Sequence, residues 1–196
     1  MDVPAAGSLI MRVVAGRLRG RRLETPAGSA IRPTADRVRE ALFNILAHGE
    51  RVPGGLAGAV VLDAFAGTGA LGIEALSRGV VQATFLDDDE KAVRLIRRNL
   101  ETLGLARQAN VLRRDATKPG TRVGAPATLA FLDPPYGQGL AAPALAALAA
   151  GGWLAAGALC VVEVGARDAL DPPTGFAAED ERRYGAARLV LVRCTT

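Results

Sequence analysis

Two short motifs bring together side chains and backbone shapes that could do chemistry. The first is Asp63-Ala-Phe-Ala-Gly67-Thr-Gly69-Ala-Leu-Gly72, which directly follows an apolar run. In parallel sheets, ligands lie beyond the carboxyl ends of the strands, and a glycine-rich turn lets the backbone approach them closely. The glycine spacing also satisfies GxGxxG, and Asp87 ends the next apolar run about where a ribose-binding acid is expected. Taken alone, this motif fits a nicotinamide or flavin enzyme.

The carboxylate of Asp63 favours a different ligand. Asp63 precedes Gly67 by four residues, so it would face a bound pyrophosphate at short range with an unfavourable charge contact. It would instead favour a ligand that carries an ammonium group. S-adenosylmethionine carries an amino group and a sulfonium, so the motif indicates a site for this cofactor. The structural alternative is that Asp63 only caps the turn that follows its strand.

The second motif is Asp133-Pro134-Pro135-Tyr136, which follows another apolar run. The Pro-Pro turn holds an acceptor carboxylate, an acceptor carbonyl without a competing N–H, and an aromatic face. This combination suits a planar base with an exocyclic amine. Because both motifs follow strands of one parallel sheet, we expect them at the same rim.

The elements that must position these motifs alternate along the chain. Strands are expected at 59–63, 83–87, 110–113, 127–132 and 158–164, and helices at 70–78, 88–103 and 140–150, after an earlier helix that begins at Thr34. An antiparallel pair is expected at 176–184 and 188–193. The predicted fold is therefore α/β and Rossmann-like, a mostly parallel seven-stranded sheet with helices on both faces and an antiparallel C-terminal strand.

The positive charge is concentrated near the N-terminus. The chain has 24 Lys and Arg against 20 Asp and Glu, a formal net charge of +4. Eight arginines and two acids fall within residues 12–39, so this segment carries +6 and the remainder, with 16 basic and 18 acidic residues, carries −2. Short strands at 10–15 and 21–24 predict a basic β-hairpin that binds a polyanion. The alternative is a solvated arginine-rich face. The candidate binding residues are Arg12, Arg17, Arg19, Arg21, Arg22, Arg32 and Arg37.

Composition narrows the class of protein further. With 49% hydrophobic and 22% charged residues, the chain can bury a real core. Cys160 and Cys194 lie outside any CxxC or Cys/His cluster, so we expect no metal site, and a reducing cytoplasm fits best. The uncharged stretch 138–162 is rich in Ala and is broken by Pro143, Gly151, Gly152 and Gly157. It predicts helix, loop and buried strand rather than a membrane span.

Together, the motifs resemble those of class I S-adenosylmethionine-dependent methyltransferases that act on exocyclic amines. The segments Arg12-Val-Val-Ala-Gly-Arg-Leu-Arg-Gly and Arg32-Pro-Thr-Ala-Asp-Arg-Val-Arg-Glu-Ala-Leu-Phe resemble the bacterial RsmD family in particular. That family methylates N2 of one specific guanine in 16S ribosomal RNA. The resemblance runs from Arg12 to the final strand. One departure is Asp87-Asp88-Asp89, where the family more usually has Glu first, so which of these acids meets the ribose stays open.

The resemblance implies a role for each site residue. The implied cofactor-binding residues are Asp63 at the methionine end of S-adenosylmethionine, Gly67 and Gly69 where the backbone approaches it, Asp87 at the ribose, and Asp115 and Ala116 at the adenine. The implied catalytic residues are Asp133, Pro134, Pro135 and Tyr136. Asp133 and the Pro134 carbonyl would accept hydrogen bonds from the guanine N2 amine, and Tyr136 would stack on the ring.

The resemblance also implies a partner and a division of the chain. Residues 1–30 would form a basic RNA-contacting extension, and residues 31–196 the methyltransferase domain. The partner would be 16S ribosomal RNA, free or within the assembling small ribosomal subunit, and we expect a monomer that uses no membrane and no metal. Two other functions stay open. An adenine-N6 methyltransferase acting on DNA or RNA suits the Asp133 motif equally, although no insertion is large enough for a DNA target-recognition domain. A non-catalytic or nicotinamide-binding protein would use the Gly67 loop alone.

Overall fold

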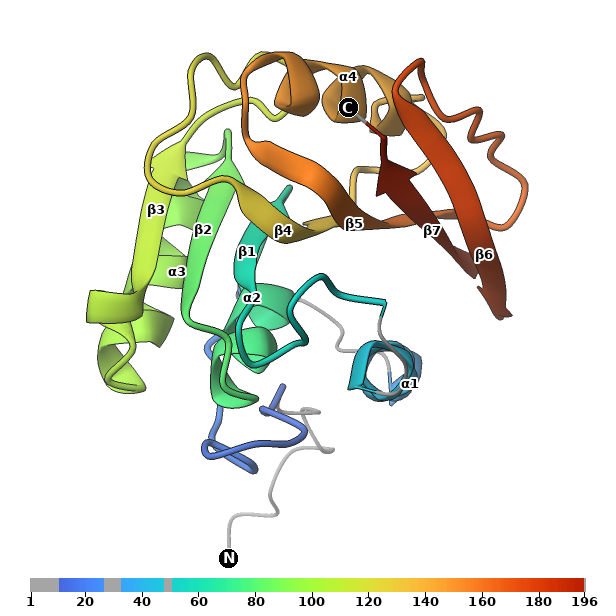
Figure 1. Cartoon of the computed structure of the whole chain (residues 1–196). Coiled ribbons are helices and arrows are strands. Elements are labelled where there is room, and N and C mark those ends of the chain that lie inside the picture. Colours follow the sequence, from blue (N-terminus) through green and yellow to red (C-terminus); the bar gives the residue numbers. More distant parts are fainter. Residues whose placement is uncertain (1–10, 27–32, 48–50, 196) are drawn as a thin grey trace, which may run out of the picture.

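The computed structural model of the protein describes residues 11–26, 33–47 and 51–195. It is built on a seven-stranded sheet (Figure 1). The strands are β1 (Val60–Ala64), β2 (Gln82–Asp87), β3 (Ala109–Arg113), β4 (Ala127–Leu132), β5 (Leu154–Gly165), β6 (Phe176–Tyr184) and β7 (Ala187–Cys194). Their order in the sheet is β3-β2-β1-β4-β5-β7-β6, and β7 is antiparallel to both of its neighbours while the other pairs are parallel. The predicted fold class is confirmed.

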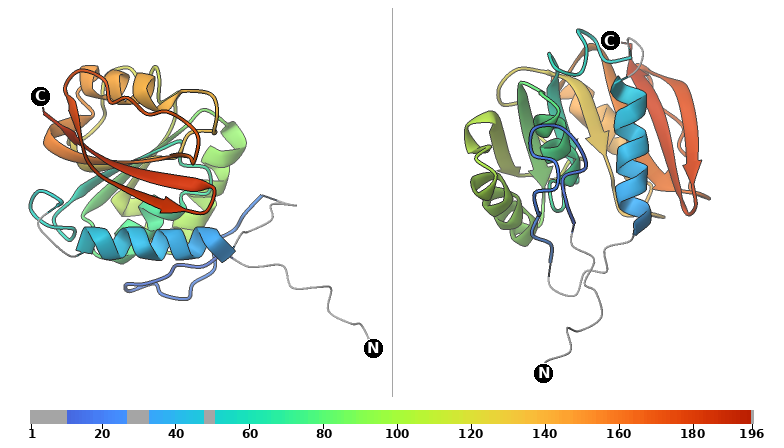
Figure 2. Two further views of the ribbon diagram at one scale, coloured as in Figure 1. Left: turned by 90° about the vertical axis from the view of Figure 1, so that its right-hand side faces the viewer. Right: turned by 90° about the horizontal axis from the view of Figure 1, so that it is seen from below.

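In the described part of the chain, four α-helices cover the two faces of the sheet. They are α1 (Pro33–Ala47), α2 (Ala70–Ser77), α3 (Glu90–Thr102) and α4 (Ala141–Ala150). Apolar residues of α1, α2 and α3 pack in one buried cluster, whereas those of α4 pack in a second cluster on the other face. Figure 2 shows α1 and α4 on opposite sides of the sheet. The central strands β1 and β4 are largely apolar because alternate residues, such as Val61 and Leu62, point into different clusters.

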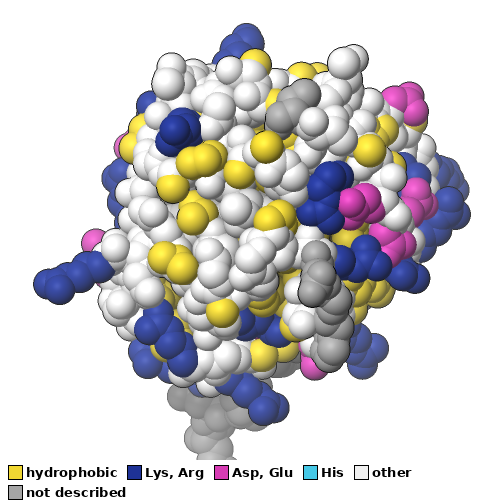
Figure 3. All heavy atoms as spheres, viewed as in Figure 1, with side chains coloured by type: hydrophobic (Ala, Val, Ile, Leu, Met, Phe, Trp, Pro, Cys, Tyr) yellow, Lys and Arg dark blue, Asp and Glu magenta, His cyan; other side chains and the backbone are white. Residues whose placement is uncertain are grey.

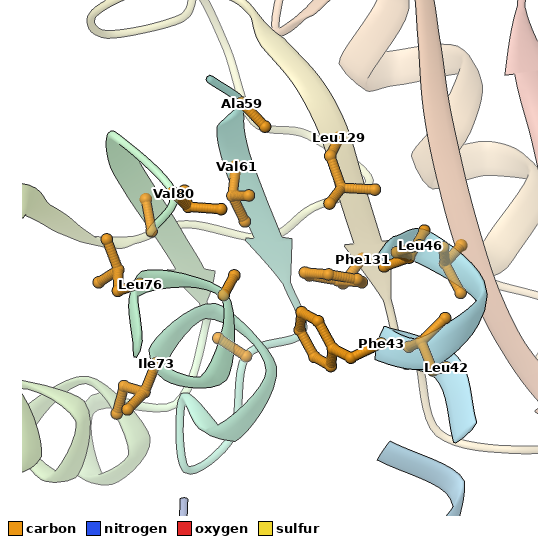
Figure 4. Packing of buried hydrophobic residues seen from close by; sticks show 14 of the residues in the cluster. Leu42, Phe43, Leu46, Ala59, Val61, Ile73, Leu76, Val80, Leu129 and Phe131 are labelled. Atoms are coloured by element: carbon orange, nitrogen blue, oxygen red, sulfur yellow. The ribbon is translucent and has the colours of Figure 1, made fainter. Parts of the chain in front are cut away.

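Helix α1 packs directly beneath the strands that carry the two motifs. The rings of Phe43 and Phe131 lie 5.6 Å apart between their centroids (Figure 4). Leu42 and Leu46 on the same face of α1 are also buried. This contact fixes α1 close to the end of β4, where Asp133 begins the second motif.

The predicted element boundaries lie within two residues of those observed, except at the start of β5. That strand begins at Leu154 instead of residue 158. Gly157 has a φ of +74°, and the register with β4 shifts between Ala127 and Leu129. A glycine that bends a strand at a bulge looks like a loop in the sequence, which explains the difference.

The predicted N-terminal β-hairpin is not confirmed as a pair of strands. In the segment 11–26, which we call the arm, a single antiparallel bridge joins Arg12 and Arg22. Backbone hydrogen bonds cross the arm from the N–H of Val13 to the carbonyl of Arg21 and from that of Leu23 to that of Met11, both at 2.9 Å, but other N–H groups bond to buried side chains of α2. Glu74 accepts from the N–H groups of Val14 and Ala15 at 2.7 and 2.9 Å, and Ser77 Oγ accepts from that of Leu18 at 3.0 Å. These contacts leave fewer backbone groups for a regular ladder.

Two further predictions concern the domain boundary after residue 30 and the uncharged stretch 138–162. The boundary between residues 30 and 31 lies outside the described residues, as does Arg32. Within the ranges that the structure describes, no helix has the length and apolar character needed to cross a membrane. The stretch 138–162 forms α4 and part of β5 with a turn between them, as predicted.

Candidate active site

Two adjoining hollows lie at the carboxyl ends of the parallel strands. The first has a volume of about 500 Å³ and is bordered by strand ends, by α1, by Met11 of the arm and by the turn between β6 and β7. The second, of about 430 Å³, extends over the end of β2, where Asp87 and Asp88 border it. Four residues border both hollows: Phe65, Asp133, Tyr136 and Glu163. The two motifs found in the sequence therefore meet at one rim of the sheet.

Asp63 borders the first hollow from the end of β1, and it also caps α2. Its Oδ2 accepts a hydrogen bond from the backbone N–H of Gly72 at 2.8 Å. Burial raises the pKa of Asp63 to about 8, and the nearby carboxylates of Asp133 and Asp87 add to this rise. A buried carboxyl group of this kind gains most from a cationic ligand, because a positive charge beside it favours the ionised form. The capping role and a binding role are therefore compatible.

The loop between β1 and α2 has an unusual backbone. Phe65 is not a glycine but has a positive φ of 59°, and Gly67 has a φ of 55°. The N–H of Gly67 donates to Asp87 Oδ2 at 2.8 Å, so the loop is tied to the end of β2. Gly67 borders the first hollow, and the nearest atom to a Cβ built there, the oxygen of Phe65, is 4.0 Å away. Backbone at Gly67 is thus open to a ligand.

Gly69 is needed for a different reason. Its φ is 76°, and a Cβ built there would lie 3.3 Å from side-chain atoms of both Ile96 and Phe85. Gly69 does not border either hollow. This glycine therefore allows the loop to pack on the core, while Gly67 presents backbone to the hollow.

The acids after β2 divide into two roles. Asp87 Oδ1 accepts from the N–H of Asp89 at 3.0 Å, and burial raises the pKa of Asp87. Asp89 is the N-cap of α3 and accepts from the N–H of Lys91 at 2.8 Å. Since Asp87 and Asp88 border the second hollow and Asp89 caps a helix, the first two are the candidates for binding hydroxyl groups there.

Asp115 and Ala116 follow β3 but border neither hollow. The carboxylate of Asp115 accepts from both the hydroxyl and the backbone N–H of Thr117, at 2.7 and 2.8 Å. These hydrogen bonds lower the pKa of Asp115. Ala116 is buried. The N–H of Arg114 bonds to the carbonyl of Asp87 at 3.0 Å, so this segment lies next to the end of β2.

The Asp133 motif begins where β4 ends. The N–H of Asp133 bonds to the carbonyl of Ala64 at 3.4 Å, which holds it beside β1. Asp133 is exposed and opens onto both hollows, and partial loss of hydration, together with the charge of Glu163, raises the pKa of its carboxyl group to about 7. Pro134 is buried and Pro135 is exposed. Tyr136 is 46% exposed, and its hydroxyl donates to Glu163 Oε1.

Several residues at the hollows were not predicted from the sequence. Glu163 lies near the end of β5, and its only signal is a single acid in an apolar strand. Arg39 of α1 is buried, borders the first hollow and donates from Nη2 to the carbonyl of Arg12 at 2.6 Å. Phe65 and Tyr184 also border the first hollow. Aromatic and basic side chains of this kind look like core or surface residues until the fold brings them together.

The arginines of the arm are exposed, and three of them already have protein partners. Arg12 donates to the carbonyl of Gly20 at 2.9 Å, Arg17 to Gln108, and Arg21 to the carbonyl of Thr102 at 3.1 Å. In the part of the chain that the structure describes, the side chains of Arg19 and Arg22 form no hydrogen bond or ion pair. Arg37 is exposed on α1. Figure 3 shows basic side chains along the lower edge of the molecule, where Figure 1 places the arm.

Metal ligation has no support among the residues that are described, since no group of three or more His, Cys, Asp or Glu side chains lies close enough together to hold an ion.

The strand order, the single antiparallel strand and the loop after β1 are those of class I methyltransferases. The family model for conserved hypothetical protein 95 matches residues 11–193, and the chain belongs to this family, which is the RsmD family.

Individual relatives agree with this membership. Ribosomal RNA small subunit methyltransferase D of Escherichia coli K12 is 41% identical over 158 residues, which cover 81% of this chain and 76% of that protein. The protein of the same name from Haemophilus influenzae is 35% identical over 187 residues, 89% of each chain. The solved structure of yhhF from Escherichia coli is 34% identical, covers 95% of this chain and 98% of its own, and has a TM-score of 0.79.

Proposed function

We propose that the protein transfers a methyl group from S-adenosylmethionine to the exocyclic N2 of one guanine, guanine 966, of 16S ribosomal RNA. The observation that carries this proposal is that Asp133-Pro134-Pro135-Tyr136 borders the same hollows as Asp63, Gly67 and Asp87. An acceptor pair for an amine therefore lies beside a site suited to a cationic cofactor. The relatives named ribosomal RNA small subunit methyltransferase D support the RNA substrate.

The residues around β1 and β2 fit S-adenosylmethionine. The buried carboxyl group of Asp63 suits the amino group of its methionine part, and the open backbone at Gly67 allows close approach. Asp87 and Asp88 offer acceptors for ribose hydroxyls at the second hollow. We keep Asp115 and Ala116 as the proposed neighbours of the adenine, with Asp115 held in place by Thr117. When bound, S-adenosylmethionine supplies a methyl group on a positively charged sulfur.

The Asp133 motif positions the amine for attack. Asp133 and the Pro134 carbonyl accept from the two N2–H groups, which directs the nitrogen lone pair out of the plane of the base and toward the methyl carbon. As the N–C bond forms and the S–C bond breaks, N2 becomes acidic and loses one proton. With a pKa of about 7, Asp133 can accept that proton at neutral pH. No stronger base is required.

The remaining contacts hold the RNA. The half-exposed ring of Tyr136 offers a stacking surface, and a base can reach it only from an unpaired element or after leaving its stack. The exposed arginines of the arm and Arg37 of α1 contact phosphates and so position the RNA without reading its sequence. In this proposal the extension at 1–30 binds RNA and residues 31–196 carry the reaction.

A comparison of the purified protein with its Asp133→Ala variant tests the proposed chemistry. With labelled S-adenosylmethionine and 16S ribosomal RNA from cells that lack the gene, we expect turnover to fall by about 100-fold or more, because an oriented acceptor is removed. Cofactor affinity, measured by calorimetry, is expected to change far less. Asp171→Asn, at an exposed loop position, is the control. Undiminished turnover in a folded Asp133→Ala protein would contradict the proposal.

A further inference from the structure

Glu163 occupies the position next to Asp133 on the adjacent strand. In the parallel register of β4 and β5, Leu132 is the partner of Val162, so Asp133 and Glu163 stand side by side one residue further on. Leu132 and Val162 are buried in the cluster under α4, and the residues that follow them border the hollows instead. The two carboxyl groups are close enough for the charge of Glu163 to act on Asp133. The rim therefore presents two neighbouring carboxyl groups.

Tyr136 holds one oxygen of Glu163 and leaves the other available. The Tyr136 hydroxyl donates to Oε1. Across the described residues, Oε2 accepts no hydrogen bond from the protein, and Glu163 borders both hollows. A carboxylate oxygen can only accept unless it is protonated. An oxygen held at the rim in this way can accept a hydrogen bond from a donor of the substrate.

The edges of the two purines differ in what they offer to such an acceptor. Guanine presents an N1–H donor directly beside its N2 amine. Adenine presents a bare N1 lone pair beside its N6 amine. We take the base to enter with its amine at Asp133 and the Pro134 carbonyl and with ring nitrogen N1, rather than N3, toward Glu163. Guanine then donates to the carboxylate, whereas adenine places a lone pair against it, which leaves both acceptors unpaired.

We propose that Glu163 is a specificity-determining residue that selects guanine over adenine by accepting a hydrogen bond from guanine N1–H through Oε2. Tyr136 is its positioning residue, since the hydroxyl contact fixes the carboxylate while the ring face stays exposed for the base. The inference rests on the proposed function, because it requires the target base to enter with its amine at Asp133. Glu163 would then distinguish guanine from adenine, the two bases whose amines the Asp133 motif accepts equally.

The test uses a base that keeps the amine and lacks the neighbouring donor. In 2,6-diaminopurine the N2 amine is present, but N1 is an acceptor and an amine replaces O6. Small-subunit RNA is ligated with either guanine or 2,6-diaminopurine at the methylated position and supplied both free and as a reconstituted subunit. The quantity measured is the ratio of kcat/KM for the guanine RNA to that for the diaminopurine RNA.

For the natural protein we expect a ratio of about 10 to 100, the usual effect of one hydrogen bond to a charged group. In Glu163→Gln the Tyr136 hydroxyl can donate to the amide oxygen, which turns the NH2 group toward the base. The ratio is then expected to fall about tenfold or more. Any contact at the O6 position is common to both proteins, so the change in the ratio reports on Glu163 alone. Asp171→Asn is the matched acid-to-amide control and is expected to keep the natural ratio.

Each outcome supports or overturns the inference. A ratio near one in the natural protein overturns it, and so does an unchanged ratio in Glu163→Gln. If Glu163→Gln does not fold or turn over, Glu163→Asp serves instead. It keeps the carboxylate but withdraws it by one methylene, so a ratio between one and the natural value is expected, and an undiminished ratio overturns the inference. Failure of the natural protein to methylate either RNA would refute the proposed function itself.

Discussion

Replacement of Asp63 by Asn should make the protein more stable and, at the same time, poorer at binding its cofactor. The amide oxygen can still accept the N–H of Gly72, which Asp63 Oδ2 accepts at 2.8 Å, so the cap on α2 is kept. The substitution removes a carboxyl group that burial makes costly to ionise. The variant therefore separates the stability of the site from its binding function.

The size of the effect follows from the shift in pKa. The pKa of Asp63 rises from 3.8 in the unfolded chain to about 8 in the folded protein. Between these values the folded state holds a proton that the unfolded state has released, so the free energy of unfolding falls as the pH rises. At about 1.4 kcal/mol for each pKa unit, the upper limit of this decrease at pH 8 is about 6 kcal/mol. Below about pH 4 both states are protonated and there is no decrease.

Urea denaturation of both proteins at pH 4, 6 and 8 measures this difference. The free energy of unfolding of Asp63→Asn, relative to the natural protein, should increase steadily from pH 4 to pH 8 and level off above it. Calorimetry at pH 7 should show that the affinity for S-adenosylmethionine falls, because the amide cannot pair with an ammonium group. A stability difference that does not depend on pH would refute the assignment of Asp63 as a carboxyl group held at high pKa.

Three other predictions concern the arm and the loop. Asn99→Ala removes three hydrogen bonds, two to the backbone of the arm and one to the backbone of the glycine loop. Urea titration should show that the free energy of unfolding falls by about 3 kcal/mol, and an unchanged value would show that these bonds are dispensable. Replacing Arg19 and Arg22 by Ala should make the slope of log RNA affinity against log salt concentration shallower, by about 0.7 to 0.9 for each phosphate that the arm no longer neutralises. An identical slope would exclude binding of the RNA backbone by these residues. Gly69→Ala should lower the free energy of unfolding by about 1–3 kcal/mol, because Gly69 has a positive φ and lies close to core side chains, and by more than Gly67→Ala, where the space is open. Equal losses of stability in chemical denaturation would contradict the different roles assigned to the two glycines.

The parts of the fold that sequence predicted well are those set by local patterns. Strands buried on both faces are largely apolar, so β1, β2 and β4 could be recognised in the sequence as apolar runs. Each of these strands ends at an aspartate or at the residue next to one. Three acids, Asp87, Asp88 and Asp89, stand together before α3, and only the geometry shows that Asp89 is its N-cap. The arm was harder to predict. Short apolar and basic runs suggested a regular pair of strands, but the N–H groups of Val14 and Ala15 bond to Glu74, a single buried acid far from them in the sequence.

The candidate site was predictable only where its residues stand in sequence motifs. Asp63, Gly67 and Asp133 fall at strand ends, and one parallel sheet brings all such ends to one rim. Glu163 joins them through the register of β5 with β4, which depends on a bulge near Gly157 that the sequence does not reveal. Arg39 reaches the hollow because α1 packs under β4, a tertiary contact with no local signal.

The identity of the methylated nucleoside tests the central claim most directly. Small-subunit ribosomal RNA from cells that lack the gene is incubated with the purified protein and S-adenosylmethionine, digested, and examined by mass spectrometry of the nucleosides. The proposed function predicts one new N2-methylguanosine per RNA molecule, absent with the Asp133→Ala variant. N6-methyladenosine in its place would leave the fold and the cofactor site standing and contradict the assignment of guanine as the substrate.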